Sequence, residues 1–216
     1  MNFDSAREQM IDQQVRAWDV LQPQVLRVLG EVPREHFVPA QWQQLAFADT
    51  EIPLAHGENM MAPKVEGRLL QSLEIEAGDR ILEIGTGTGF LTACLARLGE
   101  HVVSIDCHSD FVATASDKLR ELDIVNTELV TMDAMQALPA GEFDAVAVTG
   151  SVPVFEQRFA DALAIDGRLF LVVGEPPVME ALLVTRSGEN EWSRESLFET
   201  VLNPLRNAAR PSEFRF

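Results

Sequence analysis

A turn with three alternating glycines constrains this sequence more than any other feature. Residues 83–90 read Glu-Ile-Gly-Thr-Gly-Thr-Gly-Phe, after an apolar stretch at 80–84 and before a helical pattern at 90–98. Glycine permits a tight turn and lets a ligand approach the backbone closely, and a helix that starts there points its positive end at the ligand. The turn therefore predicts a ligand site between a strand and a helix.

From residue 78 onwards, strand and helix patterns alternate. Strands are predicted at 80–84, 101–105, 127–131, 143–148 and 168–173, and helices at 90–98, 109–121 and 154–163. The stretch 143–148 is almost wholly apolar, as expected of a strand buried on both faces. Two further strands, near 180–187 and 192–201, are expected to be antiparallel around the polar turn 187–190. This alternation predicts an α/β fold with a mostly parallel seven-stranded sheet and helices on both faces.

The residues before this pattern are predicted to form a helical appendage. Helical patterns cover 4–17, 22–30 and 64–73, and Gly30 is expected to end the second of them. Residues 46–63 form a long irregular stretch with Pro53, Gly57 and Pro63, and such a stretch in a compact domain is usually functional or mobile. We therefore divide the chain into 1–75, a helical region with a substrate-side loop, and 76–216, a ligand-binding domain. The two parts are expected to form one compact unit.

Charge and composition narrow the partners. The chain has 216 residues with 34 acidic and 17 basic side chains, a net charge of −17, so it lacks the basic surface that attracts nucleic acid or anionic lipid. No run of 18 apolar residues predicts a membrane span, and residues 1–18 lack the apolar core of a signal peptide. Cys94 and Cys107 are expected to be free thiols. We expect a cytoplasmic protein without nucleic-acid or membrane partners and leave its oligomeric state open.

Three acidic residues mark the ends of predicted strands. Glu83 stands two residues before the first glycine, Asp106 ends the second strand, and Asp133 follows the third. Open parallel sheets bind ligands at this edge. Glu83 would repel a pyrophosphate but can hold an ammonium group, Asp106 can accept both hydroxyls of a ribose, and Asp133 can accept from the amino group of an adenine. Together they predict a site for S-adenosylmethionine.

A dinucleotide site is the alternative for such a turn. Its fingerprint requires glycine or alanine where this chain has Phe90, which argues against a nicotinamide oxidoreductase. The expected cofactor contacts are Glu83, Gly85, Thr86, Gly87, Thr88, Gly89, Asp106, Cys107, Asp133 and Ala134. No metal is expected.

Several segments carry a resemblance to a known family. They are Val-Pro-Arg-Glu-His-Phe-Val-Pro at 32–39, Ala-Asp at 48–49, Ile-Pro-Leu at 52–54, Gly57, Pro63, Leu-Glu-Ile-Gly-Thr-Gly-Thr-Gly at 82–89, Phe-Asp-Ala-Val-Ala-Val-Thr at 143–149 and Gly-Arg-Leu at 167–169. The chain resembles the class I S-adenosylmethionine-dependent methyltransferases and, more narrowly, the protein-L-isoaspartate O-methyltransferases. The resemblance implies a Rossmann-like fold, S-adenosylmethionine as cofactor with S-adenosylhomocysteine as product, and methylation of isoaspartyl carboxylates that leads to protein repair.

One departure from the family concerns the methyl acceptor. The family has Thr-Ile-Ser before its proline, whereas this chain has Asn59-Met60-Met61-Ala62-Pro63. The resemblance places those hydroxyls beside the methyl donor and the acceptor carboxylate. Asn59 and Met61 are therefore expected on the acceptor side, together with Thr149 at the end of the fourth strand.

The acceptor is the least constrained part of the prediction. A carboxylate is already ionised at neutral pH and needs no general base, whereas an amine or hydroxyl would need one; His36, His56 and Glu58 are near the predicted loop. Two alternatives stay open: a methyltransferase of the same fold with a small-molecule acceptor, and a cofactor-binding module that transfers nothing. A nucleic-acid acceptor is disfavoured, because residues 149–151 read Thr-Gly-Ser instead of the Asn/Asp-Pro-Pro-aromatic motif.

Overall fold

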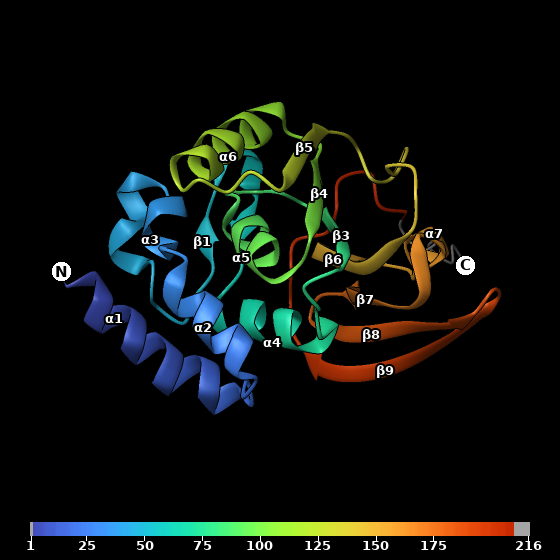
Figure 1. The fold of residues 1–216 in the computed structure, drawn as a ribbon, viewed down its shortest axis with the longest axis horizontal. Helices are drawn as coiled ribbons and strands as arrows, with labels where there is room; N and C mark the ends of the chain where they lie inside the picture. Colours follow the sequence, from blue (N-terminus) through green and yellow to red (C-terminus); the bar gives the residue numbers. More distant parts are fainter. Residues whose placement is uncertain (1, 210–216) are drawn as a thin grey trace, which may run out of the picture.

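The computed structural model describes residues 2–209, which form an α/β fold around a seven-stranded sheet (Figure 1). The strand order is β5-β4-β3-β6-β7-β8-β9. Neighbours from β5 to β7 pair in parallel, and β8 and β9 are antiparallel. The strands are β3 (Arg80–Ile84), β4 (His101–Asp106), β5 (Thr127–Thr131), β6 (Phe143–Val152), β7 (Leu163–Glu175), β8 (Val178–Gly188) and β9 (Glu191–Glu199). The predicted fold class is confirmed.

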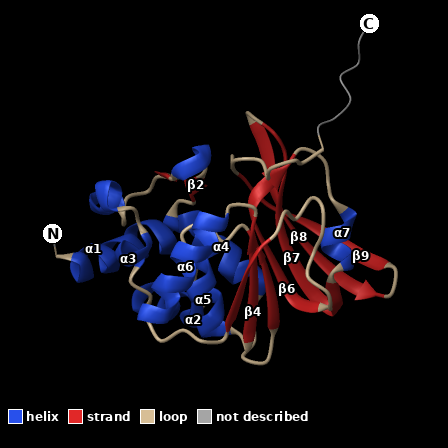
Figure 2. Ribbon diagram, turned by 90° about the horizontal axis from the view of Figure 1, so that it is seen from above, coloured by secondary structure: helices blue, strands red, loops and turns tan. Residues whose placement is uncertain are grey.

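Helices cover the two faces of the sheet unequally. Figure 2 shows most helices gathered on one face, with α7 (Gln157–Asp161) on the other. On the well-covered face, α4 (Pro63–Leu73), α5 (Phe90–Leu98) and α6 (Ser109–Glu121) pack against the sheet, and α2 (Pro23–Glu31) packs against α4 and α5. The predicted helix at 154–163 is wrong at both ends: Glu156 is an N-cap with extended backbone, and Leu163 is fully buried and already pairs with Phe143 in the sheet.

The N-terminal region shares its core with the sheet. A helical segment made of α1 (Phe3–Met10), η1 (Ile11–Val15) and η2 (Arg16–Trp18) is followed by α2, which continues one residue past Gly30. One apolar cluster contains Val15 and Leu69 together with Phe170 and Val172 of β7. Burying these side chains together favours a single packed unit, although the boundary at residues 75 and 76 stays a prediction.

A short hairpin stands where an irregular stretch was expected. After α3 (Arg34–Phe37) and η3 (Ala40–Leu45), strands β1 (Ile52–Pro53) and β2 (Asn59–Met60) pair antiparallel with η4 (Ala55–Gly57) at the tip. We call residues 51–61 the hairpin loop. Its placement beside the carboxyl ends of the parallel strands follows from the buried Arg34, described below.

The buried side chain of Arg34 holds the hairpin loop in place. The fully buried guanidinium forms an ion pair with Glu66 of α4 and donates from Nη2 to the carbonyl of Met61, at 2.7 Å. Its Nε donates to the carbonyl of Ala46, also at 2.7 Å. A buried arginine with these partners connects α3, α4 and both ends of the stretch that contains the loop.

Among the described residues, none of the helices has both the length and the apolar character that a membrane crossing requires.

Candidate active site

A cavity opens at the carboxyl ends of the parallel strands. It encloses about 770 Å³ of empty space, part of it open to solvent. The glycine-rich turn, the hairpin loop and residues 202–206, which we call the C-terminal strap, surround it. The structure brings these predicted residues together in its wall: Asn59, Met61, Gly85, Gly87, Asp106, Cys107, Asp133, Ala134 and Thr149.

The other predicted residues lie outside the lining of this cavity. A smaller adjoining pocket is lined by Glu83, Thr86 and Thr88, and it shares Met61 and Thr149 with the main cavity. Gly89 lines neither of these pockets. A Cβ there would lie 2.8 Å from the Cβ of Ala115 in α6, and the backbone has φ +87°. Gly89 therefore allows the turn to pack closely against α6, and its contact with the cofactor stays a prediction.

Gly85 shows why the turn needs glycine. Its φ is +102°, and a Cβ there would lie 2.1 Å from the Thr149 hydroxyl oxygen. That hydroxyl donates to the carbonyl oxygens of Ile84, at 3.0 Å, and Gly85, at 2.8 Å. Thr149 sits in a bulge of β6, where the pairing with β7 shifts between Ala147 and Ser151. Bulges re-aim side chains beside sites, and this one joins β6 to the turn.

Asp106 is held by two backbone amides. It is 8% exposed, and its two oxygens accept from the N–H groups of Gly87, at 2.9 Å, and His108, at 2.8 Å. Burial raises the pKa of Asp106 above its ordinary value, against the effect of these hydrogen bonds. Each carboxylate oxygen keeps a further lone pair that can accept from a ligand hydroxyl.

Glu83 carries an oxygen without a partner. The side chain is fully buried; Oε2 accepts from Ser104 Oγ at 2.5 Å and from Thr92 Oγ1, whereas Oε1 has no hydrogen-bond partner. Burial is the largest cause that raises its pKa to about 8. Buried polar atoms are almost always paired, so the unpaired oxygen indicates a place for a donor group of a ligand. Thr86, by contrast, is engaged with Ser104, with 2.6 Å between the hydroxyl oxygens.

Asp133 organises the loop after β5. Its carboxylate accepts from the N–H of Met135, the amide of Gln136 and the amide of Asn207, at 2.9, 2.8 and 2.7 Å. Burial would raise its pKa, but these hydrogen bonds together lower it below the ordinary value. Asp133 is thus ionised, and it ties the end of the described chain to the cavity wall.

The hairpin loop brings negative charge to the cavity. Glu51 and Glu58 both line it, and Asn59 Nδ2 donates to Glu51 Oε2 at 3.0 Å. Burial raises the pKa of Glu51 above its ordinary value, against the effect of the hydrogen bond from Asn59. Met61 is 6% exposed and lines both pockets. The acceptor side therefore combines an apolar wall with one amide and two carboxyl groups.

Sequence reasoning missed the C-terminal strap and the wall residues His108 and Phe111. The strap pairs with the end of β6: Ser151 donates its N–H to the carbonyl of Asn203 at 2.9 Å, and Leu205 donates to the carbonyl of Ser151 at 2.8 Å. The only local signal was Gly150, where a Cβ would lie 2.8 Å from Leu205 Cδ2. A glycine in a strand often marks such a close approach.

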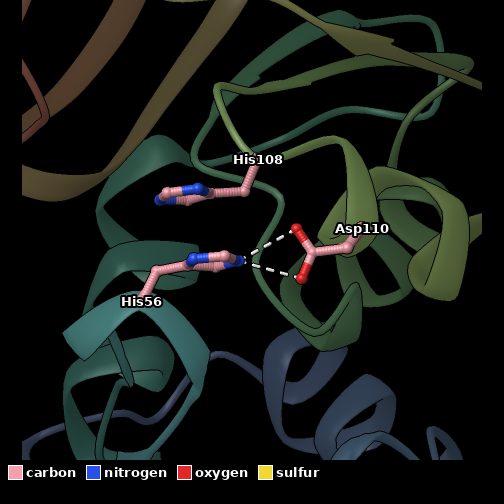
Figure 3. A group of neighbouring side chains, drawn as sticks. All are labelled: His56, His108 and Asp110. Carbon is pink, nitrogen blue, oxygen red and sulfur yellow. Dashed lines mark hydrogen bonds and ion pairs between the residues drawn. The ribbon is translucent and has the colours of Figure 1, made fainter.

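Three side chains at the rim, His56, His108 and Asp110, form the group in Figure 3. The two imidazole rings are stacked with centroids 4.0 Å apart and planes 3° from parallel, and His56 Nε2 lies 2.9 Å from Asp110 Oδ2. Ring nitrogens bind metals in the plane of the ring. Because these planes are parallel and stacked, the two rings do not converge on one ion, so the group is a stacked pair in place of a metal centre.

Comparisons with known proteins agree on one family. The family model described as "Protein-L-isoaspartate(D-aspartate) O-methyltransferase (PCMT)" matches residues 5–209. The chain is 33% identical over 204 residues to the protein-L-isoaspartate O-methyltransferase of Koribacter versatilis, covering 94% of this chain and 91% of that one. It is 32% identical over 210 residues to protein-L-isoaspartate O-methyltransferase 1 of Geotalea uraniireducens, covering 96% of each.

A solved structure shows the same fold. A crystal structure from Plasmodium falciparum, described as a protein-L-isoaspartate O-methyltransferase in complex with S-adenosyl-L-homocysteine, matches with a TM-score of 0.81 at 20% sequence identity. The match covers 95% of this chain and 99% of that one, so the whole described architecture is common to both.

Proposed function

This chain belongs to the protein-L-isoaspartate(D-aspartate) O-methyltransferase family, and from that membership we propose that it methylates isoaspartyl carboxylates of damaged proteins. Its class is that of the S-adenosylmethionine-dependent methyltransferases. The observation that carries the proposal is that the glycine-rich turn, Asp106 and the hairpin loop line the same cavity.

The residues present fit the cofactor. Asp106 offers two oxygens, already oriented by backbone amides, to a pair of ribose hydroxyls. Asp133 lies at the same edge and can accept from the adenine amino group. The unpaired Oε1 of Glu83 suits the ammonium group of the amino-acid end. Gly85, Gly87, Thr88, Cys107 and Ala134 would supply backbone and close packing, and Thr86 would brace the turn.

Bound S-adenosylmethionine supplies an electrophilic methyl group on a sulfonium sulfur. The remaining work of the protein is to position the acceptor and remove water from it, and positioning of this kind supplies effective molarities of about 10⁵ to 10⁸ M. An isoaspartyl carboxylate is ionised at neutral pH, so no side chain has to take a proton from it.

The acceptor wall provides orientation. Asn59 uses one amide hydrogen for Glu51 and keeps a second that can donate to an acceptor oxygen. Met61 supplies an apolar surface that excludes water, and Thr149, whose hydroxyl hydrogen is used by the turn, keeps lone pairs and a methyl group for packing.

A small-molecule acceptor with a cationic group is the second candidate. It is favoured by the two carboxyl groups of Glu51 and Glu58 in the cavity wall, where Arg206 is the one arginine or lysine among the described lining residues. Glu58 lies 3.4 Å from Arg206 Nε, and this ion pair offsets part of the negative charge. The offset favours the isoaspartyl acceptor over the cationic one.

Partners and location follow from the same proposal. We propose that the chain works on proteins or peptides in the cytoplasm, and not on nucleic acids or at membranes. The net charge of −17 and the two free cysteines support this setting.

The test uses labelled S-adenosylmethionine and two peptides that differ only in one isoaspartyl or aspartyl linkage. Base-labile label on the isoaspartyl peptide alone is the expected result. Calorimetric titration with S-adenosylhomocysteine, run on the same preparation, shows that the protein is competent to bind. A preparation that binds S-adenosylhomocysteine but labels neither peptide would overturn the proposed acceptor, and a survey of amine-bearing small molecules would follow.

A further inference from the structure

Two histidines from different parts of the site meet at the rim of the cavity. His56 belongs to η4 at the tip of the hairpin loop, whereas His108 follows the proposed ribose carboxylate, Asp106, by two residues. Their rings stack at 4.0 Å with planes 3° apart (Figure 3). The pair is therefore a direct contact between the acceptor side and the cofactor side.

His56 is presented by an unusual backbone. Its φ is +61°, and Gly57 follows with φ +77°. A left-handed conformation is uncommon for a residue other than glycine and persists where surrounding contacts hold it. Those contacts are the carboxylate of Asp110, 2.9 Å from His56 Nε2, and Arg206 Nη2, which donates to the His56 carbonyl at 2.8 Å.

His108 is joined to the cofactor side by its backbone. Its N–H donates to Asp106 Oδ1 at 2.8 Å, and its ring lines the cavity. On the other side, His108 Nε2 is buried without a hydrogen bond and lies 3.7 Å from Glu58 Oε1 of the hairpin loop. The edge of Phe111 closes the stack, with its ring centroid 5.4 Å from both imidazoles. Two residues of the loop thus reach one imidazole of the wall.

We propose that His56 and His108 are positioning residues whose stacking docks the hairpin loop onto the cofactor-binding wall. The loop that receives the acceptor and the carboxylate that holds the cofactor are then fixed by one contact. The inference rests on the proposed function for the identity of both ligands. This proposal predicts an effect that a role of His108 in the cavity wall alone would not produce. His56 lies outside the lining of the main cavity, yet its loss should weaken cofactor binding.

The first experiment is a double-mutant cycle read by calorimetric titration with S-adenosylhomocysteine. H56A and H108A are each expected to weaken binding roughly three- to ten-fold, the range for an aromatic pair. The double variant H56A/H108A should have about the same affinity as the single variant that binds S-adenosylhomocysteine less tightly, because both substitutions remove the same contact. H101A is the control, because His101 stands at the opposite end of β4 from Asp106; its affinity should be unchanged.

A conservative variant separates stacking from the Asp110 contact. H56F keeps an aromatic face and loses the hydrogen bond to Asp110, so it should recover most of the affinity that H56A loses. The proposal would be overturned if H56A bound S-adenosylhomocysteine like the wild type while H108A bound it more weakly. His108 would then act only as a residue of the cavity wall. The proposal would also be overturned if the losses in binding free energy of H56A and H108A were additive in the double variant.

A second measurement needs no ligand. The chain has four histidines, so the ring-proton resonances of His56 can be assigned by comparing NMR spectra of the variants. Stacking predicts an upfield ring-current shift for His56 that disappears in H108A and persists in H101A. A His56 signal that does not move in H108A would show that the rings are not stacked in solution.

These measurements are independent of the acceptor. Coupled histidines in a protein that labels no isoaspartyl peptide would support the docking contact and overturn the proposed acceptor. Isoaspartyl methylation in a protein whose histidine losses add would support the proposed function and overturn the docking contact. With an active enzyme, H56A should also raise the KM for the isoaspartyl peptide more than it lowers kcat, because docking acts on binding geometry.

Discussion

The two halves of the cavity are built by different means. The cofactor half consists of strand ends and a turn, and its geometry is set by neighbours such as Gly87, whose N–H donates to Asp106 nineteen residues away. The acceptor half is a hairpin held by distant partners; Arg206 donates to the carbonyl of His56, 150 residues apart in the chain. Apart from the proposed stack of His56 on His108, the two halves are held by different contacts, so a fold of this kind can keep its cofactor chemistry while the acceptor side changes.

The halves also differ in what a substitution disturbs. In the cofactor half, backbone conformation and close approach leave little room for other residues, as at Gly85. In the acceptor half, Asn59 and Met61 stand where the resemblance to the family implies hydroxyl residues, and the hairpin still forms. We expect substitutions in the first half to weaken cofactor binding most, and those in the second half, apart from His56, to change the acceptor or the stability.

The largest effect is expected at Gly85. A Cβ in G85A would overlap the Thr149 hydroxyl, 2.1 Å away, on a backbone with φ +102°. Strain of this backbone alone is worth about 1–3 kcal/mol, and the overlap adds to it, so binding of S-adenosylhomocysteine should weaken at least about a hundred-fold. Calorimetric titration measures this loss.

The matched control is G78A, because a Cβ at Gly78 would meet nothing within 4 Å. It should bind S-adenosylhomocysteine like the wild type. Near-normal binding by G85A would show that the turn can rearrange, and the cofactor half would then be no more rigid than the hairpin loop.

The next largest effect concerns the support of the acceptor half. R34A leaves the buried Glu66 without its cationic partner and the Met61 carbonyl without its donor. Breaking a buried ion pair from one side lowers the free energy of unfolding by about 3–5 kcal/mol. Urea unfolding should show this loss, with the KM for an isoaspartyl peptide affected more than the affinity for S-adenosylhomocysteine.

Two further variants sharpen the result. R27A removes an exposed arginine of α2 and should leave the stability nearly unchanged. The double variant R34M/E66L removes both charges and should be more stable than R34A, because no unpaired charge stays buried. A double variant as unstable as R34A would assign the loss to packing instead of the ion pair.

A pH dependence is expected from Glu83 in the cofactor half. Its pKa is raised from the ordinary value of 4.5 to about 8, chiefly by burial. Between these two values the unfolded chain has released the proton and the folded protein has kept it, so stability falls as the pH rises through this window. Relative to E83Q, the wild type should lose up to about 1.4 kcal/mol per pH unit.

Urea unfolding of both proteins between about pH 5 and pH 8 measures this difference. Saturating S-adenosylhomocysteine should reduce it, because the ammonium group favours the ionised carboxylate and its binding releases the proton. Equal slopes for the wild type and E83Q would mean that Glu83 is ionised in the free protein, and that its unpaired oxygen needs another explanation.

The sequence predicted best those elements whose cause is local. Strand β3 and helix α5 have the bounds that their patterns predicted, because a buried strand, a glycine-rich turn and a periodic helix each reveal themselves over a few residues. Asp106 and Asp133 could be assigned to one edge because parallel strands end together. Their roles toward a ligand stay predictions.

The rest depends on contacts between distant residues. The C-terminal strap follows the last strand and has no periodic pattern, and its bond from Asn203 to the carbonyl of Gly57 joins residues 146 positions apart. The stacking of His56 on His108 has the same origin, since nothing near either residue indicates the other. Shared strand edges can be inferred from one sequence; side-chain pairs that close a loop over them cannot.

The smallest effect is expected where the acceptor half departs from its family. M61S would restore a hydroxyl beside the acceptor, and a hydrogen bond to a charged group is worth about 1.5–3 kcal/mol at most, or roughly ten- to a hundred-fold in rate. Replacing a side chain that is only 6% exposed also removes apolar packing, so we expect a net gain in kcat/KM of about ten-fold or less, with a lower melting temperature. Because Met61 lies in the acceptor half, its substitution should leave the affinity for S-adenosylhomocysteine within about two-fold of the wild type. A change in that affinity as large as the change in kcat/KM would mean that Met61, which lines both pockets, belongs to the cofactor half as much as to the acceptor half.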